Sequence, residues 1–441
     1  MSGTAQAVDG NMLIAATVLA GSYVLIFSEL IHRTSAALLG AVTMVAVGML
    51  FGFYSQEAAI SSIDANTILL LAAMMMLVAL LRPTGAFEYT AIVIARLSRG
   101  DPRRLLIYLS LAVSLISMVL DNVTTIIVFA PLTVLIARIL MLNPLPFLMS
   151  EAILSNVGGA STLVGDPPNI MIGSAAHIDF TTFLAHMGPP IAVIWAATVL
   201  LLLGMFRAEL APRGDGLRTE HFDLRHALKD TRSLWLVMLS LGLVVFLFFV
   251  HHHLGIFPSF AAFLGLALAL ALLRPRPEDL FGEVNWSVLV FFACLFVIVG
   301  GVESSGLLAL LGRQLAAMAA DPARLLLACL ALMWIAAAMS AVVDNIPFTV
   351  TMIPIILGLE ASGTQITPLW WALAIGVGLG GNSTHIGATA NLIAVTEAER
   401  SGIPGARITP LAWMRIGIPT TLLGLTMASV IYVAFFERFA A

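Results

Sequence analysis

The chain has 441 residues, of which 60% are hydrophobic and only 10% are charged. Soluble domains carry about 25% charged residues, so this composition excludes an ordinary soluble protein and indicates a surface that faces lipid. The formal net charge of -4 excludes nothing, because in such a protein the placement of charges matters more than their sum.

Apolar runs divide the chain into segments, many of which approach the roughly 20 residues that cross a bilayer as a helix. The runs are continuous rather than alternating, which argues against an outer-membrane barrel. We therefore predict an all-α polytopic membrane protein. The segments are 11–27, 34–53, 66–82, 86–98, 103–140, 146–177 and 183–206, then 233–250, 257–273, 286–302, 304–319, 323–358, 367–400 and 409–436.

The second group of segments repeats the first in order. The stretch Asp101–Leu106 has its counterpart in Asp321–Leu326, and Pro131 and Pro354 stand at the same distance after an Asp-Asn pair. Charges, prolines and glycines keep a common offset, so we predict an internal duplication. Its parts are a first repeat at 1–206, a cytoplasmic connector at 207–232 and a second repeat at 233–441.

Two segments of each repeat cannot be ordinary spans. Residues 103–140 and 323–358 are too long for one crossing and are interrupted by an Asp-Asn cluster, so we predict that each is a re-entrant hairpin. Residues 146–177 and 367–400 are predicted broken helices, interrupted by glycine-rich clusters. Irregular backbone within a membrane is tolerated only where protein or a wet cavity surrounds it.

A hairpin makes no net crossing, so each predicted repeat crosses the membrane five times. This odd number gives the two repeats opposite orientations. If the N-terminus is outside, nearly all lysines and arginines face the cytoplasm, and Arg313, Arg324 and Arg438 are the exceptions. We therefore expect both termini outside, in a multi-pass protein of the bacterial cytoplasmic (inner) membrane.

The hairpin tips and the breaks are four polar clusters that we predict to form one midplane site. Inverted repeats with broken helices place half-helix N-termini and unwound carbonyls around a shared site. Glycines let the backbone approach a ligand, and Asn, Ser and Thr offer neutral donors and acceptors. The predicted substrate- and ion-binding residues are Asp121, Asn122, Thr124, Thr125, Gly158, Gly159, Ser161, Thr162, Gly165, Asp166, Asn169, Asp344, Asn345, Thr349, Gly380, Gly381, Asn382, Ser383, Thr384, Gly387 and Asn391.

Three aspartates in these clusters are candidates for proton coupling, because an acidic group within a membrane is by default a functional candidate. Asp121 and Asp344 are expected at the two hairpin tips, related by a pseudo-twofold axis. Asp166 has no acidic twin, since Ala388 stands at the equivalent position. The alternative for Asp166 is a cap for the helix that Pro167 begins, and the alternative for the whole set is caps and kinks.

Motifs for other kinds of function are missing from the sequence. There is no phosphate-binding Walker loop, no dinucleotide fingerprint and no nucleophile constellation, so neither ATP drive nor catalysis is expected. Cys294 and Cys329 have no metal-ligand spacing. We expect no cofactor, no metal and no nucleic-acid partner.

At the four clusters the chain resembles the ion transporter superfamily, and within it the ArsB/NhaD group of arsenite efflux pumps, NhaD-type sodium/proton antiporters and P protein-like permeases. The resemblance covers nearly the whole chain. Dicarboxylate carriers of this superfamily have Ser-Asn-Thr at the hairpin tips. Here Asp121–Thr124 and Asp344–Pro347 stand there instead, which disfavours a carboxylate substrate.

The resemblance implies a scaffold, which often forms a dimer interface, and a moving transport part, here 86–177 and 304–400. It implies alternating access, powered by a proton gradient or alternatively by sodium. Its expected partners are the lipid bilayer, a second copy in a homodimer and a small inorganic substrate, with a cytosolic ATPase subunit as a further candidate.

The resemblance supplies the candidate substrates, and the polar groups at the clusters are compatible with one of them. Near neutral pH arsenite is an uncharged trihydroxy species, which suits a small pocket of hydroxyls, amides and carboxylates. We predict extrusion of arsenite or antimonite in exchange for protons. The alternative is Na⁺(Li⁺)/H⁺ antiport, and a carboxylate or other anion carrier and an ion channel rank after it.

Overall fold

The computed structural model describes residues 9–28, 30–211, 227–308, 310, 322–342, 345–360, 364–403 and 405–440. Within these ranges the regular structure is entirely helical, without a strand. Eight helices are long and apolar enough to cross a membrane, and α1, α12 and α17 are shorter apolar helices. The all-α polytopic fold predicted from composition is confirmed.

The described residues of the first half form ten α-helices and one 3₁₀ turn. They are α1 (Gly10–Ser28), α2 (Arg33–Phe51), α3 (Gln56–Ser61), α4 (Ala65–Leu81), η1 (Arg82–Thr84), α5 (Ala86–Leu97), α6 (Pro102–Ser117), α7 (Asn122–Ile139), α8 (Leu145–Gly159), α9 (Pro167–Ala175) and α10 (Phe180–Met205).

The described part of the second half has matching elements in the same order. They are α11 (Thr231–Leu254), α12 (Pro258–Leu273), α13 (Pro277–Gly282), α14 (Trp286–Ser304), α16 (Pro322–Val342), α17 (Asn345–Glu360), α18 (Thr367–Gly380), η4 (Gly381–Ser383), α19 (Thr389–Arg400), α20 (Pro410–Ala434) and α21 (Phe436–Ala440). The segment predicted at 304–319 lies outside the described residues from 311 onward, and so do residues 212–226 of the connector.

Helix breaks occur where the polar clusters predict them. In the first hairpin α6 ends at Ser117 and α7 begins at Asn122, with Asp121 as its N-cap. In the first broken helix α8 ends at Gly159 and α9 begins at Pro167. The second hairpin has the same two limbs, α16 and α17, but its tip residues 343 and 344 lie outside the described part of the chain. The predicted Asp344 is therefore not placed.

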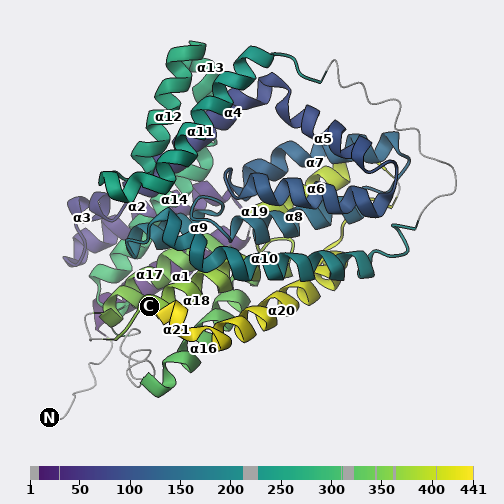
Figure 1. Ribbon diagram of the computed structural model, residues 1–441. Coiled ribbons are helices and arrows are strands. Elements are labelled where there is room, and N and C mark those ends of the chain that lie inside the picture. The colour runs from purple at the N-terminus through teal and green to yellow at the C-terminus, as the bar shows by residue number, and fades with distance from the viewer. Residues whose placement is uncertain are drawn as a thin grey trace.

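Helices of the two halves pack into two groups. Helices α4, α11 and α12 pack together at one end of the molecule, and α1, α2 and α14 pack together beside them. The hairpins and broken helices form the other group, in which α6, α7 and α8 lie side by side (Figure 1). The second limb of each broken helix packs on helices of the other half of the chain. Helix α19 packs on α7 and α8, and α9 packs on α17 and α18.

The same hydrogen bonds recur where each broken helix meets its hairpin. Thr162 Oγ1 donates to the carbonyl of Met118 at 2.6 Å, and Thr384 Oγ1 donates to the carbonyl of Ala341 at 2.5 Å. A second pair of equivalent bonds runs from Ser117 Oγ to the Ser155 carbonyl and from Ser340 Oγ to the Val377 carbonyl. These bonds provide donors for carbonyl groups near the helix ends. Both halves therefore stabilise their helix ends with the same residue types at equivalent positions.

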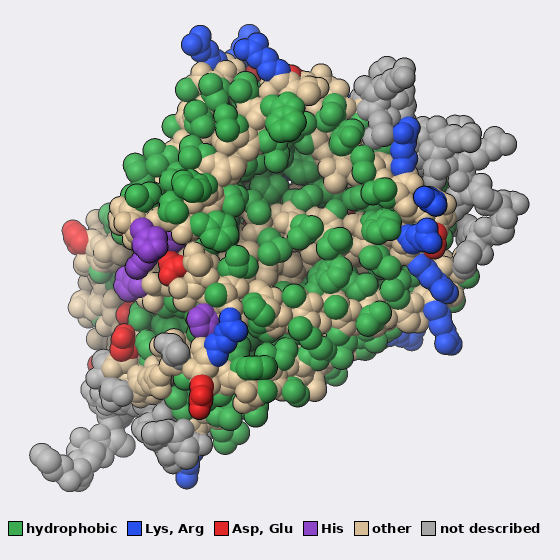
Figure 2. Space-filling model, viewed as in Figure 1, with side chains coloured by type: hydrophobic (Ala, Val, Ile, Leu, Met, Phe, Trp, Pro, Cys, Tyr) green, Lys and Arg blue, Asp and Glu red, His purple; other side chains and the backbone are tan. Residues whose placement is uncertain are grey.

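The surface divides into an apolar zone and polar edges. Hydrophobic side chains cover most of the face seen in Figure 2, with lysines and arginines gathered at its upper and right edges and acidic and histidine side chains mainly at the left. Such a belt between polar margins is the surface expected of a protein embedded in lipid.

Candidate functional site

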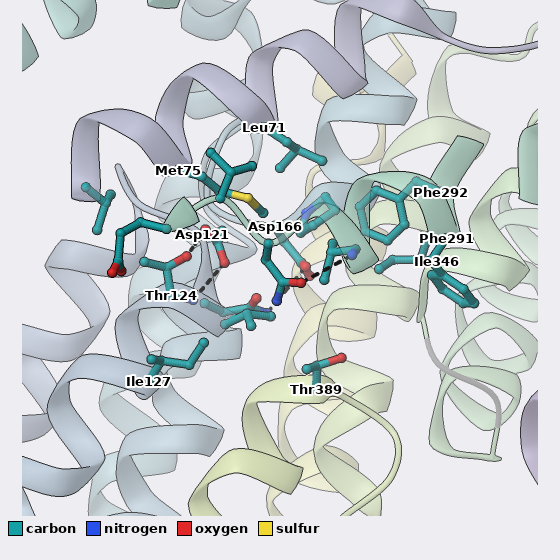
Figure 3. A pocket seen from close by; sticks show the side chains of 18 of the residues that line it. Leu71, Met75, Asp121, Thr124, Ile127, Asp166, Phe291, Phe292, Ile346 and Thr389 are labelled. Carbon is teal, nitrogen blue, oxygen red and sulfur yellow. Dashed lines mark hydrogen bonds between the residues drawn. The ribbon is translucent and has the colours of Figure 1, made fainter. Parts of the chain in front are cut away.

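A cavity of about 330 Å³ lies between two long helices, α4 and α14, and residues next to the helix breaks. One wall comes from α4, through Leu71 and Met75, and from α14, through Phe291 and Phe292. Figure 3 shows Asp121 and Asp166 lying below Met75, at the breaks of the first hairpin and the first broken helix. The cavity therefore has an apolar roof and a polar floor.

Asp166 is the most deeply buried carboxylate of the cavity floor, with 1% of its surface exposed. Asn122 Nδ2 donates to Asp166 Oδ1 at 3.4 Å, and Asn345 Nδ2 donates to Oδ1 at 3.3 Å and to Oδ2 at 3.1 Å. These two asparagines begin α7 and α17, the second limbs of the two hairpins. A single carboxylate thus joins both hairpins.

The side chain of Asp166 does not cap α9. The residue occupies the N-cap position, but no side-chain hydrogen bond to the first turn is formed. The cap alternative predicted for Asp166 is therefore wrong, because its carboxylate is directed to the hairpin amides instead.

Asp121 differs, because both of its carboxylate oxygens stabilise the start of α7. Oδ1 accepts a hydrogen bond from the backbone N–H of Thr124 at 2.8 Å, and Oδ2 accepts one from Thr124 Oγ1 at 2.6 Å. Both residues also line the cavity. Asp121 thus caps α7 and also lines the cavity. The two interpretations, a helix cap and a functional residue, are therefore compatible for Asp121.

Asn156 connects the two broken helices and was not predicted. Its Oδ1 accepts from Asn122 Nδ2 at 2.9 Å, and its Nδ2 donates to Asn382 Oδ1 at 2.8 Å and to Asn391 Oδ1 at 3.0 Å. Asn122 Oδ1 is buried with no hydrogen-bond partner in the described structure. A buried amide oxygen without a donor beside the Asp166 carboxylate is a ready ligand for a cation or a hydroxyl.

The predicted glycines have another role than the one expected. A Cβ at Gly158 would lie 2.7 Å from the Ser114 carbonyl oxygen, one at Gly165 2.6 Å from the Gly159 oxygen, and one at Gly387 2.6 Å from the Gly381 oxygen. These glycines are buried and are not among the cavity-lining residues. The prediction that they allow a ligand to approach the backbone is therefore corrected, because they allow backbone to approach backbone, as do Gly159, Gly380 and Gly381.

Most predicted hydroxyl and amide groups do not line the cavity and instead donate hydrogen bonds to backbone carbonyls near the helix breaks. Asn169 Nδ2 donates to the carbonyls of Gly159 and Thr162, and Asn391 Nδ2 donates to those of Gly381 and Thr384. Thr125, Ser161 and Thr349 each donate to a carbonyl of their own helix turn, and Ser383 lies in η4. Of the predicted set, the residues that line the cavity are Asp121, Asn122, Thr124, Asp166 and Asn345.

The rim of the cavity carries charged residues that the motifs did not indicate. Arg82 forms an ion pair with Glu283 at 3.2 Å, and both side chains stay partly exposed. Arg33 Nη1 donates to Thr389 Oγ1 at 2.9 Å and lies over the ring of Phe291. These residues come from segments far apart in the chain. The sequence analysis used the arginines only to predict the orientation of the protein in the membrane.

Comparison with known proteins places the chain among transporters. The sequence model of the CitMHS family, described as citrate transporters, matches residues 23–376. The chain belongs to the citrate transporter family.

Relatives of this family member extend over nearly its whole length. The 46 kDa membrane protein of Mycobacterium leprae is 37% identical over 428 residues, which cover 95% of this chain and 97% of that protein. An uncharacterized transporter of Mycobacterium tuberculosis is 39% identical over 427 residues, with the same coverage of both chains. The human P protein is 32% identical over 502 residues, which cover 95% of this chain and 59% of the P protein.

A solved structure has the same fold. The crystal structure of the YdaH transporter of Alcanivorax borkumensis, described as having an unusual topology, matches with a TM-score of 0.59 and 13% identity over 98% of this chain and 100% of that one. At this identity the likeness concerns the fold alone. Membership of this family makes the protein a membrane transporter and not an enzyme.

Proposed function

We propose that the protein is a secondary active transporter with alternating access that exports arsenite or antimonite in exchange for protons. The observation that carries the proposal is the Asp166 carboxylate, buried on the cavity floor and held by amides from both hairpins. Such a group binds a proton or a cargo and changes its exposure when the hairpins move against the scaffold.

The chemistry of the cavity suits a small hydroxylated solute. Uncharged arsenite presents three hydroxyl groups, which donate to oxygens. Asp121, Asp166 and the unpartnered Asn122 Oδ1 supply oxygens on the floor of the cavity. Neither Cys294 nor Cys329 is among the described residues that line the cavity, so release does not require breaking an arsenic–sulfur bond.

The rim fits an inward-facing state under the topology predicted above. Arg33 and Arg82 face the cytoplasm in that topology, and both line the cavity. A cargo entering from the cytoplasm reaches Asp166 past the Arg82–Glu283 ion pair. Further parts of the proposal are the bacterial inner membrane as the location, protons as the coupling ion and a homodimer assembled through the scaffold.

Transport into everted membrane vesicles tests the proposal. Vesicles from a transporter-deficient host that makes the protein are expected to accumulate arsenite when respiration acidifies their interior, and an uncoupler or Asp166→Asn is expected to abolish the accumulation. No accumulation above vesicles without the protein would reject arsenite as cargo.

Sodium/proton antiport is the second candidate, favoured by the unpartnered Asn122 Oδ1 next to a carboxylate, since hard cations prefer such oxygen ligands. Sodium-dependent proton movement in proteoliposomes would support it. Citrate belongs in the same assay because the family model carries its name. Citrate uptake without response to arsenite or sodium would replace both candidates.

A further inference from the structure

Glu151 is a second buried carboxyl group in the hairpin and broken-helix region, and it does not line the cavity. It lies within α8 with 1% of its surface exposed. Thr133 Oγ1, from α7 and also 1% exposed, donates to Glu151 Oε1 at 2.5 Å. Glu151 Oε2 has no hydrogen-bond partner in the described structure.

No cation on the described neighbouring helices pairs with this carboxyl group. The helices that pack on α8 are α6, α7, α10, α18, α19 and the short η4, and neither α18 nor η4 carries a titratable group. The charged or titratable side chains of the others are Arg103, Arg104, Tyr108, Arg138, His186, Glu397, Glu399 and Arg400, and each is engaged elsewhere or exposed. Arg138, for example, donates to the Ser401 carbonyl at 2.7 Å.

Burial without a cation decides the protonation state of Glu151. An ionised carboxylate that is buried without a cation beside it is strongly disfavoured, even after the protein relaxes. The carboxyl group therefore carries a proton in the packed state seen here, with Oε1 accepting from Thr133 and the second oxygen available for the proton.

The second repeat supplies an internal comparison. Pro131 aligned with Pro354 places Thr133 opposite Ile356, and Gly158 aligned with Gly380 places Glu151 opposite Leu373. Ile356 and Leu373 are both 0% exposed, on α17 and α18, which pack on each other. The same position between hairpin and broken helix is thus filled by an apolar pair, so packing alone does not require an acid there.

Glu151 also lies between one end of α8 and the cavity floor. It stands six positions after Leu145 (151 − 145), about 9 Å along the helix at 1.5 Å per residue. Asn156, further along the same helix, contacts Asn122, which donates to Asp166. Glu151, Asn156 and Asp166 all belong to the first broken helix, and Leu373, Gly378 and Ala388 replace them in the second.

We propose that Glu151, hydrogen-bonded to Thr133, is a second proton-binding site, distinct from Asp121 and Asp166. It takes up and releases one proton as α7 and α8 change their exposure. Its part in coupling rests on the proposed proton-driven transport, whereas proton binding itself does not.

Infrared difference spectroscopy tests proton binding without a substrate. The full-length protein in lipid, titrated over pH, is expected to show loss of a carboxylic-acid carbonyl band at alkaline pH, and Glu151→Gln is expected to remove that band. Glutamine keeps an oxygen that accepts from Thr133. Glu88→Gln, which removes only a surface ion pair with Lys229 at 3.4 Å, is the matched control and is expected to keep the band. An identical spectrum in Glu151→Gln, or no titration in the wild type, would overturn the proposal.

Transport assays then test the role in coupling, with the cargo that the vesicle experiments identify. Glu151→Gln is expected to remove one proton from the exchange ratio and to flatten the pH dependence of transport. The double variant Thr133→Ile with Glu151→Leu copies the second repeat, so it is expected to fold and to show the same loss. If the wild type transports no cargo of the panel while the infrared band titrates, the proposed function fails and the proton site stands. An unchanged ratio and pH profile in both variants would refute the coupling role.

Discussion

Asp166 and Ala388 occupy the same backbone position in the two broken helices. Asp166 is the N-cap residue of α9, with φ -146° and ψ 133°, and Ala388 is the N-cap residue of α19, with φ -149° and ψ 142°. Both residues line the cavity, and neither uses its side chain to cap its helix. The backbone of the break therefore forms without a carboxyl group, and an acidic side chain is present at this position in the first broken helix but not in the second.

Replacing Asp166 by alanine tests whether this acidic side chain is functional. Asp166→Ala is expected to abolish coupled transport, because the exchangeable carboxylate is gone. The protein is expected to fold, since Ala388 supports the same conformation. The Asn345 amide loses its acceptor, which costs roughly 1–3 kcal/mol if it stays unpaired, whereas Asn122 keeps its hydrogen bond to Asn156. Vesicle transport and thermal unfolding of the purified protein measure the two effects. Retained coupled transport would contradict the assignment.

Substitutions of Asp121 separate its cap from its charge. Asp121→Ser keeps an N-cap oxygen, whereas Asp121→Ala removes the cap and is expected to cost about 1 kcal/mol of stability. Both are expected to lose coupled transport if the charge is required, and the same loss is expected for Asp344→Asn. Transport that follows stability, intact in the serine variant and reduced in the alanine variant, would assign Asp121 to capping alone.

Asn156 is expected to be required for the junction between the repeats. Its amide donates to Asn382 Oδ1 and Asn391 Oδ1, so Asn156→Asp places a carboxylate against two acceptors. The loss of stability should be about 1–3 kcal/mol or more, since buried groups lose their partners. Asn143→Asp is the control, because Asn143 is only partly buried and contacts only the Gly405 carbonyl among its described long-range partners. Equal melting temperatures for the two variants would count against the role of Asn156.

Gly165 tests the close approach of backbone at the break. A Cβ there would lie 2.6 Å from the Gly159 oxygen and 2.7 Å from the Ser117 oxygen, and backbone atoms cannot rotate away. Gly165→Ala is expected to cost about 1–3 kcal/mol, as other forced overpacking does. Gly204→Ala, in an open position of α10, is expected to leave stability unchanged or to raise it by up to about 1 kcal/mol. A tolerated alanine at 165 would show that the break relaxes.

The sequence predicted the positions of the breaks well, and the functions of individual residues there less well. Asp121, Asn122, Thr124, Asp166 and Asn345 line the cavity, and the hairpin and broken-helix limbs end where the polar clusters stand. The predicted glycines instead pack backbone on backbone. A glycine permits any close approach, and the sequence does not tell which neighbour approaches.

The sequence by itself determined the class of protein, the helix breaks and the duplication. These follow from local properties, namely apolar runs of a length set by the bilayer and polar, helix-breaking clusters that recur in order. Only the tertiary structure decided that Asp166 joins two hairpins, that Asn156 links the broken helices and that Glu151 is buried against Thr133. These relations join residues distant in the chain, and they depend on which helix faces pack together. The sequence shows that a polar residue lies within an apolar run, but it does not show whether that residue faces a partner or a cavity.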